Sequence, residues 1–252
     1  MPALGFGTWP LKGEECRHAV AHALSLGYRH LDTAQGYENE TEVGRGMRGA
    51  GLRREEIFLV TKIRTSNFRY EQALRSSEES RKKLATPYID LLLMHWPNPD
   101  VPLAETLRAM RKLQADGVIR HIGVSNFSLQ LVEQAAQEAT IFCNQVEYHP
   151  FLSQRELIAQ SRQMDYLLTA YSPLARGKVL SDPLLQRIGA KHGKTVPQIV
   201  LRWLIQQGLS TIPKAGSDRH RAENFAVFDF ALSDEEMRAI DGLGAESYSV
   251  HR

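Results

Sequence analysis

The chain has 252 residues, 42% of them hydrophobic, and 31 basic against 29 acidic residues give it a formal net charge of +2. This length allows one large domain or two small ones, each with a full hydrophobic core. The balanced charge, without a dense basic run, argues against a nucleic-acid partner. We find neither the run of about 18 apolar residues that a membrane span needs nor the basic and apolar segments of a signal peptide. We therefore expect a cytoplasmic protein.

The composition also argues against a structural metal or a disulfide framework. Cys16 and Cys143 are the only cysteines, and they do not form a C-x-x-C pair. His18 and His22 lie four residues apart on a predicted helix, a spacing that can bind a metal ion, but the paired glutamate of a zincin motif is missing. We expect no metal site and interpret both histidines as exposed or packing residues.

Short apolar segments alternate with helical patterns from one end of the chain to the other. The predicted strands are residues 4–9, 29–33, 57–63, 89–96, 120–125, 142–148, 166–171 and 209–214. The predicted helices are residues 14–26, 40–47, 70–84, 103–115, 129–138, 153–163, 183–191, 196–207, 219–227 and 233–240. Capping boxes, Thr195 with Gln198 and Ser233 with Glu236, mark the starts of two of the later helices.

Eight strand–helix units of roughly 30 residues predict parallel strands with right-handed crossovers, and in a chain of this length they favour a (β/α)8 TIM barrel. No Pro/Gly/Ser-rich linker divides the chain, so we expect a single α/β domain over residues 1–252, with one or two extra helices near the C-terminus. An open doubly wound sheet is the alternative, but it should carry a glycine-rich turn after its first strand. The one G-x-G-x-x-G match, residues 44–49, runs through the end of the predicted helix 40–47 and not from a strand into a helix, and it is interpreted as a chance match.

Polar residues gather where the predicted strands end, which is the catalytic face of a TIM barrel. The second, third and fourth strands end near Asp32, Lys62 and His95, and Tyr37 follows the second strand. Taken singly, these residues could be a turn aspartate, a surface lysine, a core histidine and a packing tyrosine. Because the barrel would bring all four to one small face, we predict that they form a site.

Eight segments, in chain order, carry a specific signature. They are Gly5-Phe6-Gly7-Thr8-Trp9, Asp32-Thr33-Ala34 with Tyr37-Glu38-Asn39-Glu40, Val60-Thr61-Lys62, Leu93-Met94-His95-Trp96-Pro97, Gly123-Val124-Ser125-Asn126-Phe127, Asn144-Gln145-Val146-Glu147-Tyr148-His149-Pro150, Ala170-Tyr171-Ser172-Pro173-Leu174 and Ile212-Pro213-Lys214. Together they resemble the aldo-keto reductase family along the whole chain. That resemblance implies a barrel that binds a nicotinamide cofactor without a Rossmann domain and reduces aldehydes and ketones.

The family's catalytic tetrad falls on Asp32, Tyr37, Lys62 and His95. Tyr37 would be the general acid, and the Lys62 ammonium would lower its pKa from the usual value of about 10. Asp32 would keep Lys62 charged and in place. His95 would hydrogen-bond the carbonyl oxygen of the substrate.

The resemblance also implies a cofactor site. Tyr171 would stack on the nicotinamide ring, whose carboxamide Ser125, Asn126 and Gln145 would bind. Further cofactor contacts would come from Ser172, Pro173 and Leu174 at the pyrophosphate, Lys214 and Ser217 at the 2′-phosphate, and Glu223 and Asn224 at the adenine. His220 stands where the family commonly has arginine, and Arg219 is the nearest substitute. We therefore predict NADPH as the cofactor, with NADH possible.

The predicted active-site loops are short, as in the bacterial 2,5-diketo-gluconate reductases that this chain most resembles. An open pocket walled by Trp9, Trp96, Phe68 and Phe127, with His95 at its base, would suit small or polar carbonyl compounds such as diketo sugar acids or 2-oxoaldehydes. We expect a monomer whose partner is this small-molecule substrate. Two alternatives remain: a Schiff-base aldolase that uses Lys62 or Lys214, and a non-catalytic nicotinamide-binding regulatory subunit.

Overall fold

The computed structural model of the chain describes residues 1–245 and 248–250, and in this part eight parallel strands follow one another in sequence order around one sheet. The strands are β1 (Phe6–Gly7), β2 (His30–Asp32), β3 (Phe58–Ile63), β4 (Ile89–Met94), β5 (Ile119–Ser125), β6 (Ile141–Glu147), β7 (Leu167–Tyr171) and β8 (Ser210–Thr211). Each pairs in parallel with the next. The order confirms the predicted barrel and contradicts the open sheet, whose strand order would reverse.

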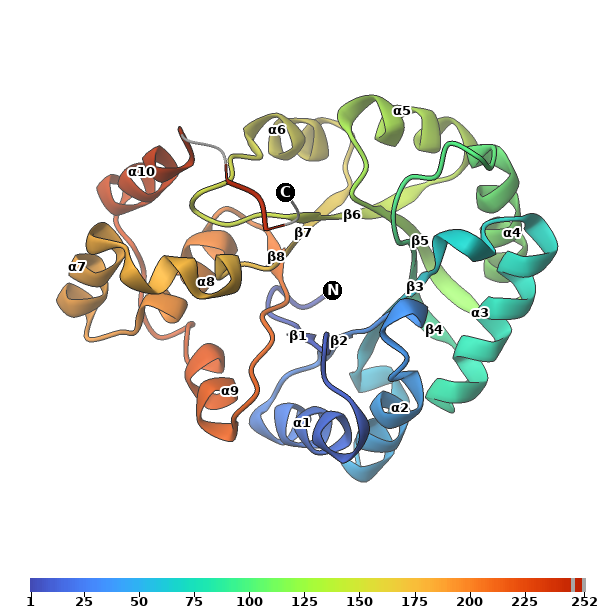
Figure 1. The fold of residues 1–252 in the computed structure, drawn as a ribbon, viewed down its shortest axis with the longest axis horizontal. Coiled ribbons are helices and arrows are strands. Elements are labelled where there is room, and N and C mark those ends of the chain that lie inside the picture. Colours follow the sequence, from blue (N-terminus) through green and yellow to red (C-terminus); the bar gives the residue numbers. More distant parts are fainter. Residues whose placement is uncertain (246–247, 251–252) are drawn as a thin grey trace.

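The sheet closes on itself through the short first and last strands. A parallel bridge joins Leu4 to Thr211. The Gly5 amide donates to the Thr211 carbonyl over 2.8 Å, and the Gly7 amide donates to the Pro213 carbonyl over 3.1 Å. Figure 1, a view down the shortest axis of the molecule, shows the strands as a ring with the helices outside it.

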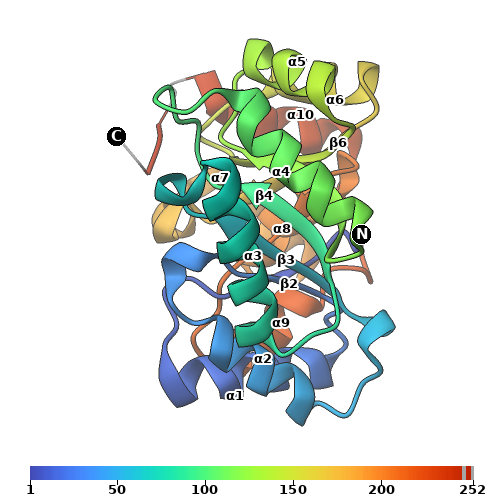
Figure 2. The same ribbon diagram turned by 90° about the vertical axis from the view of Figure 1, so that its right-hand side faces the viewer.

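Helices cover the outside of the ring. They are α1 (Gly13–Leu26), α2 (Glu40–Gly49), α3 (Tyr70–Leu84), α4 (Leu103–Ala115), α5 (Leu129–Glu138), α6 (Arg155–Gln163), α7 (Pro183–His192), α8 (Val196–Gln206), α9 (Asp218–Phe225) and α10 (Asp234–Gly242). Figure 2 shows α3 and α4 lying against the outer face of the neighbouring strands. Both predicted capping boxes form, at the starts of α8 and α10. No helix among the described residues is long and apolar enough to cross a membrane.

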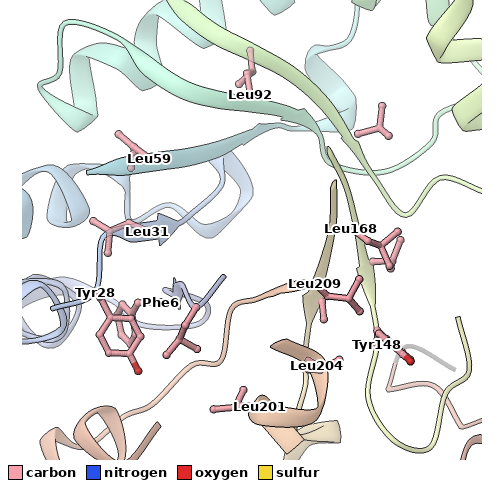
Figure 3. Close-up of a cluster of buried hydrophobic side chains, with 14 of the residues drawn as sticks. Phe6, Tyr28, Leu31, Leu59, Leu92, Tyr148, Leu168, Leu201, Leu204 and Leu209 are labelled. Carbon is pink, nitrogen blue, oxygen red and sulfur yellow. The ribbon is translucent and has the colours of Figure 1, made fainter. Parts of the chain in front are cut away.

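The core has two layers, and strand alternation assigns residues to them. Leu59 and Leu92 point outward into the large cluster between strands and helices (Figure 3). Val60 and Leu91 belong to the smaller cluster that fills the barrel. Because side chains alternate along a strand, Lys62 faces the same side as Val60, toward the barrel interior. The outer cluster is one connected set of buried side chains that includes residues from Leu4 to Val250, as expected for a single domain.

Strand ends are where prediction and structure differ most. The last strand was predicted over residues 209–214, but β8 ends at Thr211, and Pro213, which has no amide hydrogen, follows. The fourth strand ends at Met94, so His95 lies just beyond it rather than inside it. Both differences move functional candidates from strands into the loops of the carboxyl-terminal rim.

Candidate active site

Four predicted residues meet at the carboxyl-terminal end of the barrel. Asp32 is the last residue of β2, Lys62 lies near the end of β3, and Tyr37 ends the short 3₁₀ turn Gln35–Tyr37 that follows β2. The Lys62 ammonium donates hydrogen bonds to Asp32 Oδ1 over 2.5 Å and to the Tyr37 hydroxyl over 3.3 Å. The His95 ring lies edge-on to the Tyr37 ring, with 5.6 Å between their centroids. The structure therefore brings together all four members of the predicted tetrad.

The Asp32–Lys62 ion pair is almost inaccessible to water, with 1% of each residue exposed. Buried charges are costly unless every polar atom has a partner. The ammonium also donates to the Thr33 carbonyl over 2.9 Å, and Gln145 Nε2 donates to Asp32 Oδ2 over 2.7 Å. This last contact, across 113 positions of sequence, fixes the carboxylate from the far side of the barrel. No sequence pattern pointed to it.

Burial and neighbouring groups act in opposite directions on Lys62. Burial opposes its charged form, but the charge of Asp32 and the hydrogen bonds that the ammonium donates to Asp32 and Tyr37 outweigh burial and raise the pKa of the lysine. For Tyr37, burial raises the pKa above its usual value, and the Lys62 ammonium only partly offsets this. The predicted lowering of the tyrosine pKa is therefore wrong for this structure, because it considered the nearby charge and not the loss of water.

His95 is neutral at physiological pH. Burial, aided by the positive charges of Lys62 and Arg64, lowers the pKa of its ring to about 3. A neutral imidazole has one N–H donor and one acceptor nitrogen. The His95 carbonyl accepts a hydrogen bond from Asn126 Nδ2 over 3.1 Å, which ties the loop after β4 to the end of β5.

A second hydrogen-bonded group lies beside the tetrad, at the ends of β5, β6 and β7. The Tyr171 hydroxyl donates to Asn126 Oδ1 over 2.7 Å, and Asn126 Nδ2 donates to the Ser125 hydroxyl over 3.1 Å. Ser125 in turn donates to the Gln145 carbonyl over 2.8 Å. The four residues predicted to hold a nicotinamide ring thus form one contiguous wall.

A cavity of about 720 Å³ connects these groups. From the predicted sites, its lining includes Trp9, Asp32, Tyr37, His95, Trp96, Ser125, Asn126, Gln145, Tyr171, Ser172, Pro173, Leu174 and Lys214. Trp9 and Trp96 are 49% and 39% exposed, which suits the rim of an open pocket.

Two predicted pocket walls do not face this cavity. Phe68 and Phe127 are 0% and 2% exposed, and both belong to the outer hydrophobic core. The prediction that they contact substrate is wrong: each follows a strand end closely in sequence, but its side chain packs under the helices rather than over the barrel mouth.

The predicted residues of α9 and its cap lie outside the cavity lining. Ser217 accepts a hydrogen bond from the His220 amide and caps the helix. Arg219 pairs with Glu223 over 2.6 Å, His220 is exposed, and Asn224 is buried. Lys214, just before them, is the member of the group that reaches the cavity.

Sequence reasoning missed part of the lining. The additional residues are Gly7, Thr8, Pro10, Gly36, Arg176, Gly177, Ile212 and Pro213. All of them lie within one to three positions of a predicted residue. Arg176, two positions after Leu174, is the charged residue among them.

Comparison with known proteins agrees with this geometry. The profile of the Aldo/keto reductase family matches residues 3–245. The glyoxal reductase of Bacillus subtilis (strain 168) is 41% identical over 249 residues, covering 98% of this chain and 90% of the relative. The methylglyoxal reductase DkgB of Escherichia coli O157:H7 is 38% identical over 248 residues, covering 96% of this chain and 93% of the relative.

A solved structure is equally similar. The crystal structure of a proposed 2,5-diketo-D-gluconic acid reductase B has a TM-score of 0.96 and 45% identity, and the match covers 100% of this chain and 90% of that one. Fold and sequence therefore agree: the chain belongs to the aldo-keto reductase family, whose members are oxidoreductases that act on carbonyl compounds.

Proposed function

We propose that this chain reduces aldehydes and ketones to alcohols with NADPH, and that Tyr37 supplies the proton. The observation that carries the proposal is the position of the Lys62 ammonium, which contacts both Asp32 Oδ1 and the Tyr37 hydroxyl at the base of the cavity. A tyrosine hydroxyl held by a buried, charged lysine is equipped to give up a proton and to be left as a stabilised phenolate.

The residues around the cavity fit a nicotinamide dinucleotide. The volume of the cavity, about 720 Å³, lies in the range of cofactor sites. The lining offers the aromatic ring of Tyr171 and the amide of Asn126, which suit a flat heteroaromatic ring with a carboxamide. The lining also includes Lys214, which is exposed and, among the ion pairs of the described residues, has no carboxylate partner. An unneutralised ammonium beside the cavity suits a phosphate group and favours NADPH over NADH.

When bound, a reduced nicotinamide supplies a hydride to the carbonyl carbon of the substrate. The protein supplies the rest. The neutral His95 ring, next to Tyr37, offers an N–H to the carbonyl oxygen and orients it. Tyr37 keeps its proton at neutral pH because burial raises its pKa, and it delivers that proton to the developing alkoxide. Lys62 stabilises the resulting phenolate, and Asp32 keeps the lysine charged.

The substrate class follows from the relatives and from the shape of the site. Relatives named for glyoxal and methylglyoxal reduction share about two-fifths of their residues with this chain over nearly its whole length. The open rim at Trp9 and Trp96 suits small carbonyl compounds. We therefore propose 2-oxoaldehydes and other small or polar carbonyl compounds as substrates.

A Schiff-base aldolase that uses Lys62 is disfavoured by the state of this lysine. Attack on a carbonyl carbon needs an unprotonated amine. The raised pKa of Lys62 and its contact with Asp32 keep this amine charged and occupied.

The proposal is tested with Tyr37→Phe, which removes the hydroxyl and keeps the ring. We expect the kcat for methylglyoxal reduction to fall by about 10²–10⁴-fold, the usual contribution of a general acid. Binding of NADPH, followed by fluorescence titration, should be nearly unchanged. Near-full turnover by the variant would rule out Tyr37 as the acid, and absence of carbonyl-dependent NADPH oxidation by the wild type would favour the regulatory-subunit alternative.

A further inference from the structure

A buried arginine outside the tetrad holds the loop that carries Lys214. Arg221, on α9, is 1% exposed and is among the largest fully buried side chains of the described chain. Its guanidinium needs several acceptors, since a buried cation without them is strongly destabilising. The identity of these acceptors shows what the residue holds in place.

Two of the acceptors are backbone carbonyls of the loop between β8 and α9. Arg221 Nη1 donates to the Ala215 carbonyl over 2.9 Å and to the Gly216 carbonyl over 3.2 Å. In the described part of the chain, no other hydrogen bond reaches these two carbonyls. Because the loop after Pro213 no longer pairs with a neighbouring strand, the guanidinium of Arg221 supplies the hydrogen-bond donors for these two carbonyls.

The remaining contacts anchor Arg221 to its surroundings. Its Nε donates to His22 Nδ1 on α1 over 3.1 Å, and its Nη2 donates to Asp218 at the start of α9. The Tyr28 hydroxyl donates to the Arg221 carbonyl over 3.1 Å. Asp218 also contacts His18 Nε2 over 3.1 Å. The loop is thereby tied to α1, which lies beside α9 in Figure 1.

Lys214 depends on this arrangement. It directly precedes the two clamped residues, and its ammonium lies over Gly216, where an added Cβ would come within 3.9 Å of Nζ. It also lines the cavity. A shift of the Ala215–Gly216 backbone therefore moves the ammonium relative to the cavity.

We propose that Arg221 is a positioning residue for cofactor binding: by clamping residues 215–216 it holds Lys214 where it contacts the 2′-phosphate of NADPH. This inference rests on the proposed function. It assigns a role to a side chain that itself lies outside the cavity lining, and it gives His22 the supporting role of orienting the guanidinium.

The test compares binding of NADPH and NADH, which differ only in the 2′-phosphate. Dissociation constants are measured by fluorescence titration for the wild type, Arg221→Met and Arg221→Lys. In Arg221→Met, NADPH binding should weaken about tenfold, the size expected when one network is broken, while NADH binding changes less than twofold. Arg221→Lys keeps the charge and one donor group, so its dissociation constant for NADPH should lie between those of the wild type and Arg221→Met. Because the tetrad is untouched, kcat at saturating NADPH should stay close to the wild-type value.

Arg202→Met is the matched control. Arg202 lies on the neighbouring helix α8 and also donates to a backbone carbonyl, that of Val227 over 3.3 Å, but this carbonyl is remote in sequence from Lys214. The Arg202→Met substitution should leave the ratio of the dissociation constants for NADPH and NADH unchanged. If circular dichroism shows that Arg221→Met does not fold, His22→Leu is the second variant, because it removes a single acceptor of Arg221 at a partly exposed position. His22→Leu should weaken NADPH binding by less than tenfold and leave NADH binding unchanged.

The outcomes are distinguishable. A wild type that neither binds nor oxidises NADPH overturns the proposed function itself. A wild type that reduces carbonyls but binds both cofactors equally overturns the 2′-phosphate contact and this inference with it. Equal weakening of NADPH and NADH in the Arg221 variants, or no weakening, overturns the positioning role while the reductase function stands.

Discussion

At the scale of the residue, burial and charge together set the ionisation of the site. At Tyr37 burial outweighs the charge of Lys62 and raises the pKa of the hydroxyl, whereas at Lys62 the charge of Asp32 and the hydrogen bonds outweigh burial and raise the pKa of the amine. Backbone strain gathers at the same rim. Asn126, Ser172 and Arg176 adopt left-handed conformations with φ of 64°, 49° and 53°, and all three line the cavity. Such conformations cost free energy and persist where the surrounding structure enforces them, often at functional sites.

A buried histidine gives a prediction about pH and stability. Burial lowers the pKa of His30 to about 4, and its Nε2 has no hydrogen-bond partner among the residues that the structure describes. Between the unfolded pKa of about 6.5 and the folded value, the unfolded chain binds a proton that the folded chain does not, so stability is lost as the pH falls. We expect His30 to account for about 2 kcal/mol of lost unfolding free energy between pH 7 and pH 5.

Urea denaturation at the two pH values measures this effect. In His30→Leu the decrease in unfolding free energy from pH 7 to pH 5 should be smaller than in the wild type by that amount. An identical decrease in both proteins would show that His30 is not the group responsible.

At the scale of the element, the glycine pattern of α2 has a packing explanation. The G-x-G-x-x-G match at residues 44–49 lies within α2, as predicted, and does not follow a strand. A Cβ at Gly44 would lie 2.4 Å from the Leu84 carbonyl oxygen at the end of α3, and one at Gly46 would lie 2.7 Å from Val20 Cβ on α1. These glycines let three helices approach closely around the barrel.

Substitution within α2 tests this explanation. Gly44→Ala should destabilise the protein by about 1–3 kcal/mol, because backbone of α3 must move to admit the methyl group. Gly49→Ala is the control in the same helix, since among the described residues no atom outside its chain neighbours and the nearby backbone of α2 lies within 4 Å of its added Cβ. It should be neutral or stabilising by up to about 1 kcal/mol. Thermal unfolding of the two variants gives the comparison, and equal effects would refute the packing role of Gly44.

At the scale of the whole molecule, barrel closure depends on very few residues. The seam between the N-terminal segment and β8 contains two short strands, the Leu4–Thr211 bridge and a few backbone hydrogen bonds. Leu4 is 3% exposed and belongs to the continuous outer core. Closure brings the loops after β1 and β8 together, and with them Trp9 and Lys214, which both line the cavity.

Leu4→Ala tests how far the barrel acts as one cooperative unit. We expect a loss of about 2–5 kcal/mol in unfolding free energy, as for other large-to-small core substitutions. Intrinsic fluorescence and circular dichroism should follow the same single transition in urea. The control is Leu180→Ala, because Leu180 is 50% exposed. Separate transitions for the two probes would mean that the seam opens independently of the rest.

The sequence alone was sufficient for the order of the elements, the closed barrel and the four tetrad residues. Hydrophobic periodicity, capping residues and strand-end chemistry are local properties, so Asp32, Lys62 and His95 could be assigned to strand ends before any contact was known. The family resemblance suggested roles for these residues, which remain proposals, and the four side chains do lie together as predicted.

Tertiary structure alone decided which side chains face the cavity and how they ionise. Phe68 and Phe127 follow the right strands but turn into the core, whereas Arg176 lines the cavity. The contact of Gln145 with Asp32 and the Arg221 clamp join residues remote in sequence. Loop direction and solvent exclusion arise only when all eight strands and their helices pack together, and no local pattern encodes them.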